Sequence, residues 1–115
     1  KTEYRKLLNT YFGEYIYIDD ELELECFRIP HFYHAFYVYK YATGISSAIS
    51  IAKRLISNDR SAQRRYLNFL SLGGYKYPLE QLKEAGVDLT TPEPIQTAML
   101  HLKDRVSMLK QLLIK

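Results

Sequence analysis

Near the C-terminus, apolar residues recur at intervals of three and four, and this spacing constrains the fold more than any other feature of the sequence. It places them on one stripe of a helix of about 20 residues. Thr91 suits the N-cap of this helix, and Pro92 suits its first position. The stripe consists of Ile95, Met99, Leu102, Val106, Leu109 and Leu113.

Two shorter helices are predicted before this stripe, so residues 58–115 form a helical C-terminal part. The first starts near Asn58 or Asp59 and stops at Gly73-Gly74. The second has Pro78 at its first position and Gly86 as a left-handed C-terminal residue. Val87 can then fold back on Leu82, as in a Schellman motif.

Residues 30–57 are predicted to form one long helix that begins at Pro30. Its second half has helical spacing of apolar residues, and the small residues around Gly44 would let another helix approach closely. Residues 36–41 alternate weakly and also allow a strand, but no turn signal separates them from the helical half. The apolar residues of that half are Ile45, Ala48, Ile49, Ala52, Leu55 and Ile56.

Residues 1–29 form a lead-in with a weaker pattern. We expect a helix that ends at Gly13, and then a hairpin-like or irregular segment in which apolar and polar residues alternate. Because everything else is helical with short connections, the sequence predicts an all-α fold. We expect a helical bundle in which residues 1–115 form a single segment.

Composition argues against two classes of partner. The 115 residues carry a net charge of +3, which is too weak to indicate nucleic acid binding. A local basic cluster beside Tyr66 leaves a small nucleic-acid binder only as a weak alternative. No apolar stretch is long enough for a membrane span. Cys26 is the single cysteine, so no internal disulfide can form, and it is expected to be a small buried residue.

The sequence HFYHAFYVYKY, residues 31–41, concentrates hydrogen-bond donors. On a helix, Tyr33, Tyr37 and Tyr41 would share one face. A row of phenols suits an oxygen that gains negative charge in a transition state. An aromatic-rich core helix would explain the same residues. His31 and His34 could also be metal ligands, but further ligands are not evident.

Two long stretches of the sequence resemble the C-terminal part of the oligoendopeptidase F family, which are zinc metallopeptidases related to thimet oligopeptidase. They are RIPHFYHAFYVYKYATG and RYLNFLSLGGYKYPLEQLKEAGVDLTTPEP. The resemblance covers at least residues 26–100. It implies a mostly helical enzyme in which zinc is held by the two histidines of an HExxH helix and a distant glutamate. It also implies that downstream histidine and tyrosine side chains bind the substrate backbone and stabilise the oxyanion.

By this resemblance, His31 and Tyr37 are the first candidates for the catalytic donor role. The weaker candidates for substrate binding are Tyr33, His34 and Tyr41. His34 stands where the family pattern has a tyrosine, and Cys26 stands where a tryptophan is usual. The departure at His34 argues against a conserved family role for this residue. The departure at Cys26 is expected to affect only packing.

The 115 residues contain no HExxH. The resemblance therefore implies that the zinc ligands lie upstream, outside this chain. We expect zinc in the parent protein and no metal in this fragment, which should be inactive alone. The parent is expected to be a cytoplasmic oligopeptidase that cleaves internal bonds of short peptides.

Loss of the upstream part would leave apolar surface bare. The expected partners are the missing N-terminal part of the same enzyme and, through the aromatic helix or its neighbours, a second copy of the chain. A stand-alone helical interaction module without catalysis is the alternative.

Overall fold

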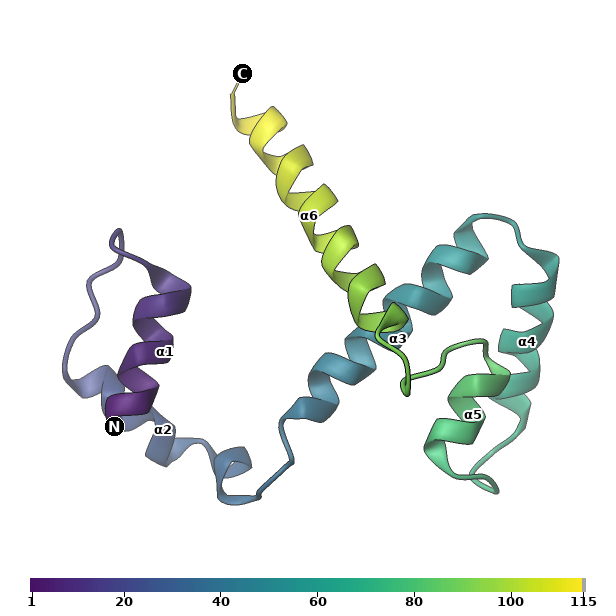
Figure 1. The fold of residues 1–115 in the computed structure, drawn as a ribbon, viewed down its shortest axis with the longest axis horizontal. Helices are drawn as coiled ribbons and strands as arrows, with labels where there is room; N and C mark the ends of the chain where they lie inside the picture. Colours follow the sequence, from purple (N-terminus) through teal and green to yellow (C-terminus); the bar gives the residue numbers. More distant parts are fainter. Residues whose placement is uncertain (115) are drawn as a thin grey trace. The chain divides into compact units, whose positions relative to one another are not determined.

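The computed structural model describes residues 1–114, and all regular elements among them are helical (Figure 1). No strand occurs in this part of the chain. The all-α prediction is therefore confirmed. The chain forms two compact units, Lys1–Tyr39 and Lys40–Lys115.

The first unit is built around helix α1 (Thr2–Phe12), which ends at Gly13 as predicted. The chain then continues without regular structure to two short elements, the 3-10 helix η1 (Glu21–Leu24) and helix α2 (Glu25–Arg28). The irregular alternative for this segment is correct up to residue 20, and no hairpin forms among these described residues.

Arg5 holds this segment against α1. Its Nη1 donates to the backbone oxygen of Asp19 at 2.9 Å and lies 3.5 Å and 3.4 Å from the carboxylates of Asp20 and Glu23. Leu8 on α1 and Ile18 in the irregular segment are buried. The Arg5 guanidinium and the buried side chains of Leu8 and Ile18 thus hold the irregular segment against α1.

The prediction of one helix from Pro30 to residue 57 is wrong in its first half. Pro30–Tyr33 form a separate 3-10 helix, η2, and helix α3 (Tyr39–Ile56) begins only at Tyr39. Between them Phe36 has a φ of 55°, a left-handed conformation that cannot continue a right-handed helix. Aromatic and β-branched residues also have low helix propensity, so the local sequence does little to prevent this break.

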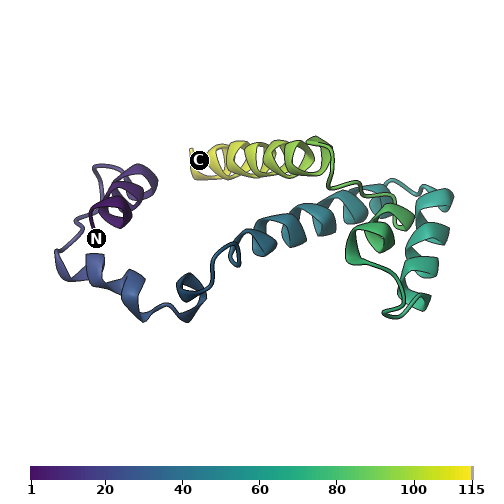
Figure 2. The ribbon, with the colours of Figure 1, turned by 60° about the horizontal axis from the view of Figure 1, so that its bottom comes forward.

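The second unit contains α3, α4 (Arg60–Ser71), α5 (Pro78–Glu84) and α6 (Glu93–Leu113), arranged as in Figures 1 and 2. Asp59 caps α4, because its carboxylate accepts from the backbone N–H of Ser61 at 2.8 Å and of Ala62 at 3.1 Å. This N-cap was one of the two predicted.

The turn after α5 is the predicted Schellman turn. Gly86 has a φ of 88°, and the N–H of Val87 donates to the Leu82 oxygen at 2.8 Å. The side chain of Val87 is fully buried. Arg54 of α3 reaches this turn: its Nη1 donates to the Gly86 carbonyl, and its Nη2 lies 3.4 Å from Oε1 of Glu93 at the start of α6.

Helix α6 begins later than predicted. Its first residue is Glu93, preceded by Pro92 at the N-cap, and Thr91 is not a cap. The Thr91 hydroxyl instead donates to the Asp88 backbone oxygen at 2.9 Å, because residues 88–91 form a turn of their own. In this turn the Asp88 carboxylate accepts two hydrogen bonds from Thr90, which lower the pKa of Asp88.

None of the helices in residues 1–114 combines the length and apolar character that crossing a membrane requires.

Replacing Gly86 by alanine should destabilise the second unit. An alanine there would have to keep the left-handed backbone conformation, which is unfavourable for a residue with a Cβ. The Cβ would also lie 2.6 Å from Arg54 Nη1 and displace the guanidinium from the Gly86 carbonyl. We expect a loss of about 1–2 kcal/mol in the free energy of unfolding, measured by urea denaturation. Gly44→Ala is the matched control: no atom lies within 4 Å of its Cβ, and a mid-helix alanine should stabilise by up to about 1 kcal/mol. Equal stability of the two variants would show that neither the left-handed turn nor the Arg54 contact requires a glycine at position 86.

Candidate functional site

The 3-10 helix η2 and the loop that follows it bring two imidazoles and one phenol together. The ring centroid of Tyr37 lies 5.4 Å from that of His31 and 5.8 Å from that of His34. These three side chains and Pro30 line an open hollow of about 320 Å³. Imidazole N–H and phenol O–H groups are both donors, so the hollow is bordered by groups that can bind a carbonyl oxygen.

Short-range constraints produce this geometry. Ile29 is extended, as residues before proline usually are, and Pro30 then starts the 3-10 turn. The left-handed Phe36 reverses the chain so that Tyr37 returns toward the histidines. The Tyr33 hydroxyl donates to the backbone oxygen of Phe27 and closes the loop from the other side.

An edge-to-face contact attaches the loop to α1. The rings of Tyr4 and Phe32 lie 6.4 Å apart with an interplanar angle of 67°. Such pairs contribute about 0.5–1.5 kcal/mol beyond the area they bury. The hollow therefore sits on backbone that is attached to the rest of the first unit.

The predicted donor row of Tyr33, Tyr37 and Tyr41 is not formed, because these residues do not share a helix. Tyr37 joins His31 and His34 instead, and these three rings all belong to the first unit. The proton of the Tyr33 hydroxyl is committed to Phe27. Tyr41 lies on α3 in the second unit, where the Lys40 ammonium is 5.5 Å from its ring.

Candidate zinc ligands are scattered over the described part of the chain. Among residues 1–114, no three histidine, cysteine, aspartate or glutamate side chains are placed so that they could hold a metal ion. Cys26 is half-buried, and its Sγ lies 3.2 Å from the Glu23 backbone oxygen to which it donates. The alternative in which the histidines bind a metal by themselves therefore finds no third ligand in the described part of the chain.

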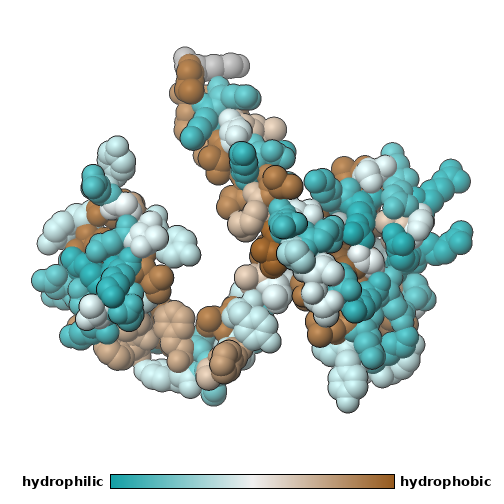
Figure 3. All heavy atoms as spheres, in the orientation of Figure 1, coloured by the Kyte–Doolittle hydropathy of each residue, from teal (hydrophilic) through white to brown (hydrophobic). Residues whose placement is uncertain are grey.

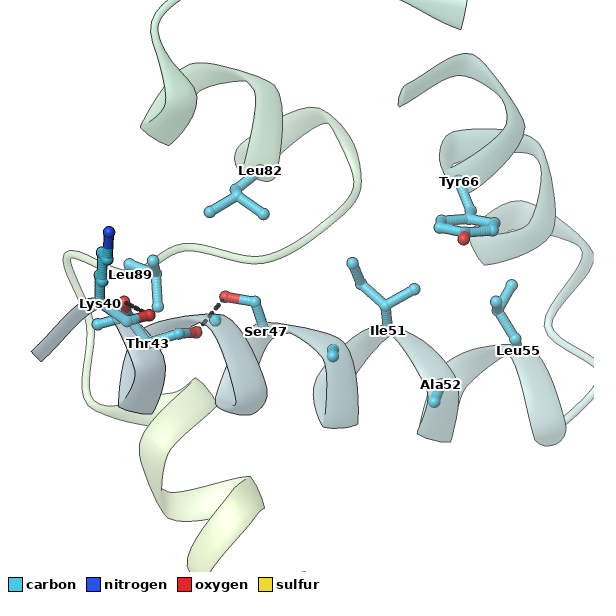
Figure 4. A pocket seen from close by; sticks show the side chains of 11 residues that line it. Lys40, Thr43, Ser47, Ile51, Ala52, Leu55, Tyr66, Leu82 and Leu89 are labelled. Atoms are coloured by element: carbon cyan, nitrogen blue, oxygen red, sulfur yellow. Dashed lines mark hydrogen bonds between the residues drawn. The ribbon is translucent and has the colours of Figure 1, made fainter. Parts of the chain in front are cut away.

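A second, larger hollow of about 440 Å³ lies in the second unit between α3, α4 and α5 (Figure 4). Its floor is one face of α3, on which the Ser47 hydroxyl donates to the Thr43 backbone oxygen at 2.8 Å. Tyr66, Leu82 and Leu89 form its walls. Within the described chain, no carboxylate, histidine or cysteine lines this hollow, and its polar lining groups are the Lys40 ammonium and the hydroxyls of Thr43, Ser47 and Tyr66.

The sequence profile of Peptidase family M3 matches residues 1–100. The chain belongs to this family. The family membership that the sequence resemblance predicts is thus confirmed over residues 1–100.

Relatives of this M3 chain include named oligoendopeptidases. Oligopeptidase PepF of Bacillus subtilis (strain 168) is 43% identical over 112 residues, which are 97% of this chain and 17% of the relative. An oligoendopeptidase F homolog of Borreliella burgdorferi is 46% identical over 109 residues, 95% of this chain and 18% of the relative. The crystal structure of oligoendopeptidase-F from Enterococcus faecium matches with a TM-score of 0.87 and 38% identity, over 97% of this chain and 22% of that one. The chain thus spans about a fifth of the length of the proteins it matches.

Removing the Tyr33 hydroxyl should weaken the loop without touching the imidazoles. Tyr33→Phe deletes the hydrogen bond to the Phe27 oxygen, and we expect the free energy of unfolding to fall by about 0.5–1.5 kcal/mol. Chemical denaturation followed by tyrosine fluorescence measures this. Tyr15→Phe is the control, because Tyr15 is fully exposed and its loss should change nothing measurable. Equal stability of the two variants would show that the hydrogen bond from Tyr33 to Phe27 does not stabilise the loop.

Proposed function

We propose that this chain is the C-terminal part of a zinc-dependent oligoendopeptidase that hydrolyses internal bonds of short peptides. Membership of Peptidase family M3 supports the reaction class. The meeting of His31, His34 and Tyr37 at one open hollow is the observation that supports a role for this chain in it. We further propose that the parent enzyme works in the cytoplasm.

The proposed role is to bind the peptide backbone and the oxyanion. When a peptide carbonyl is attacked, its oxygen gains negative charge, and fixed donors that point at it lower the barrier. His31 and Tyr37 supply these donors, since an imidazole N–H and a phenol O–H both carry a proton at neutral pH. His31 is exposed and Tyr37 is half-buried, so an extended peptide can reach both groups from the open side of the hollow.

Three further residues are proposed to bind the substrate beside the donors His31 and Tyr37. His34 borders the same hollow and is the nearest of them. Tyr33 offers its exposed ring and its oxygen lone pairs, because its proton is donated to Phe27. Tyr41 offers an exposed ring at the start of α3.

Zinc is proposed to be held by the longer polypeptide and not by this chain. The described residues bring no three candidate ligands together, and the sequence contains no HExxH. The N-terminal part of the same enzyme is therefore the proposed main partner of this chain. Self-association through exposed apolar surface, by way of the aromatic segment or its neighbours, is a second proposed interaction of the isolated fragment.

A stand-alone helical interaction module is the second candidate, and one observation favours it: every residue from Met99 to Ile114 is exposed. An in-frame HExxH in the upstream reading frame would decide for the peptidase. An upstream frame without one would decide for the interaction module.

In the full-length enzyme, Tyr37→Phe should lower kcat by about 10²–10³-fold and leave KM nearly unchanged, because an oxyanion donor acts mainly in the transition state. Steady-state hydrolysis of an internally quenched peptide measures both constants. Tyr77→Phe is the matched control, since Tyr77 is a highly exposed tyrosine at the N-terminus of α5. A Tyr37→Phe enzyme with the kcat of the control would exclude Tyr37 from this role.

The 115-residue chain alone should not hydrolyse the same peptide, even with added zinc, because residues 1–114 bring no three candidate metal ligands together and the sequence contains no HExxH glutamate to activate a water. Fluorescence release is compared with that of the full-length enzyme as the positive control. Turnover by the fragment above the buffer rate would refute the proposal that the zinc site lies outside this chain.

A further inference from the structure

Helix α6 has an apolar stripe that no other element of the second unit covers. Pro94 and Ala98 at its start are buried, but every residue from Met99 to Ile114 is exposed. Figures 1 and 2 show this part of α6 extending away from α4 and α5, and apolar atoms are visible along it in Figure 3. Most of the stability of a helix in a protein comes from tertiary packing of its amphipathic face, so this stretch is expected to have a partner.

The spacing of the stripe specifies the shape of the missing partner. Large apolar residues alternate at steps of four and three, a repeat of 3.5 residues that forms a narrow seam for a second helix. A sheet would cover a broader face. The seam residues are Ile95, Met99, Leu102, Val106, Leu109 and Leu113, with exposed fractions between 39% and 73%.

The charges beside the seam specify the partner's chemistry. Lys103 and Lys110 follow seam residues on one flank, and Arg105 precedes one on the other. The only acidic residue after Glu93 in this helix is Asp104, which the heptad places on the opposite face. A second α6 would oppose cation to cation in either orientation, which disfavours self-pairing.

We propose that α6 from residue 99 onward is the docking surface for an amphipathic helix with acidic flanks that belongs to the remainder of the same polypeptide. The length of the relatives supports this source, because this chain covers only about a fifth of them. The inference rests on the proposed function only in assuming that the chain is part of a longer enzyme.

Zero-length cross-linking of the full-length protein with a carbodiimide tests this, because the reagent joins an amine to a carboxylate only when the two are in contact. We expect Lys103 or Lys110 to be joined, within a monomer, to aspartate or glutamate outside this chain, as mapped by mass spectrometry. The cross-link between Lys83 and Asp88 is the internal positive control, since these groups lie 3.2 Å apart. The double variant Lys103→Gln, Lys110→Gln should lose the long-range cross-links and keep the control.

Three results would overturn the proposal. The first is the absence of cross-links from both lysines while the Lys83 control forms. The second is their occurrence only in a covalent dimer, which would indicate a second copy. The third is co-sedimentation with vesicles of anionic phospholipid that the double variant loses, which would indicate a membrane surface. Full-length protein that hydrolyses peptide without these cross-links would refute this inference alone, whereas cross-links without hydrolysis would count against the proposed function alone.

Discussion

The backbone of Phe36 is the constraint on which the candidate site depends. A φ of 55° in a bulky residue is unfavourable by about 1–3 kcal/mol, and it persists only where surrounding contacts impose it. Here the hydrogen bond from Tyr33 to Phe27 and the packing of Phe32 on Tyr4 lie on the preceding turn. The left-handed residue delays α3 to Tyr39 and turns the following phenol back toward two imidazoles. Strained backbone of this kind is concentrated at functional sites.

Prediction from the sequence succeeded where the determinants are local. The cap at Asp59 and the turn at Gly86 and Val87 each depend on residues within five positions, so the pattern alone predicted them. The start of α3 could not be predicted, because a left-handed phenylalanine has no sequence signature and residues 33–41 fit a helix period. Only the family resemblance indicates His31 and Tyr37, and only the fold shows that they meet His34.

In the second unit, burial along α6 ends close to where the family profile ends. Arg54 links α3 to the Gly86 turn and to Glu93, and the burial of Pro94 and Ala98 continues this packing into α6. The Peptidase family M3 profile stops at residue 100, two residues after the last buried side chain. The rest of α6 therefore takes its stability from contacts that the other helices of the second unit do not provide. Its regular pattern is evident from the sequence, whereas its partner is not.

In the proposed site, the hydrogen bond from Tyr33 to Phe27 would also have an energetic consequence for a bound peptide. It restricts the main chain that carries His31 and His34 before any ligand arrives, so the entropy lost in ordering these donors is already lost when the protein folds. Binding then needs less reorganisation, and more of the interaction energy can favour the charged form of the bound carbonyl. The Tyr33 hydroxyl, which donates its hydrogen bond to the backbone, would in this way assist turnover without donating to the substrate.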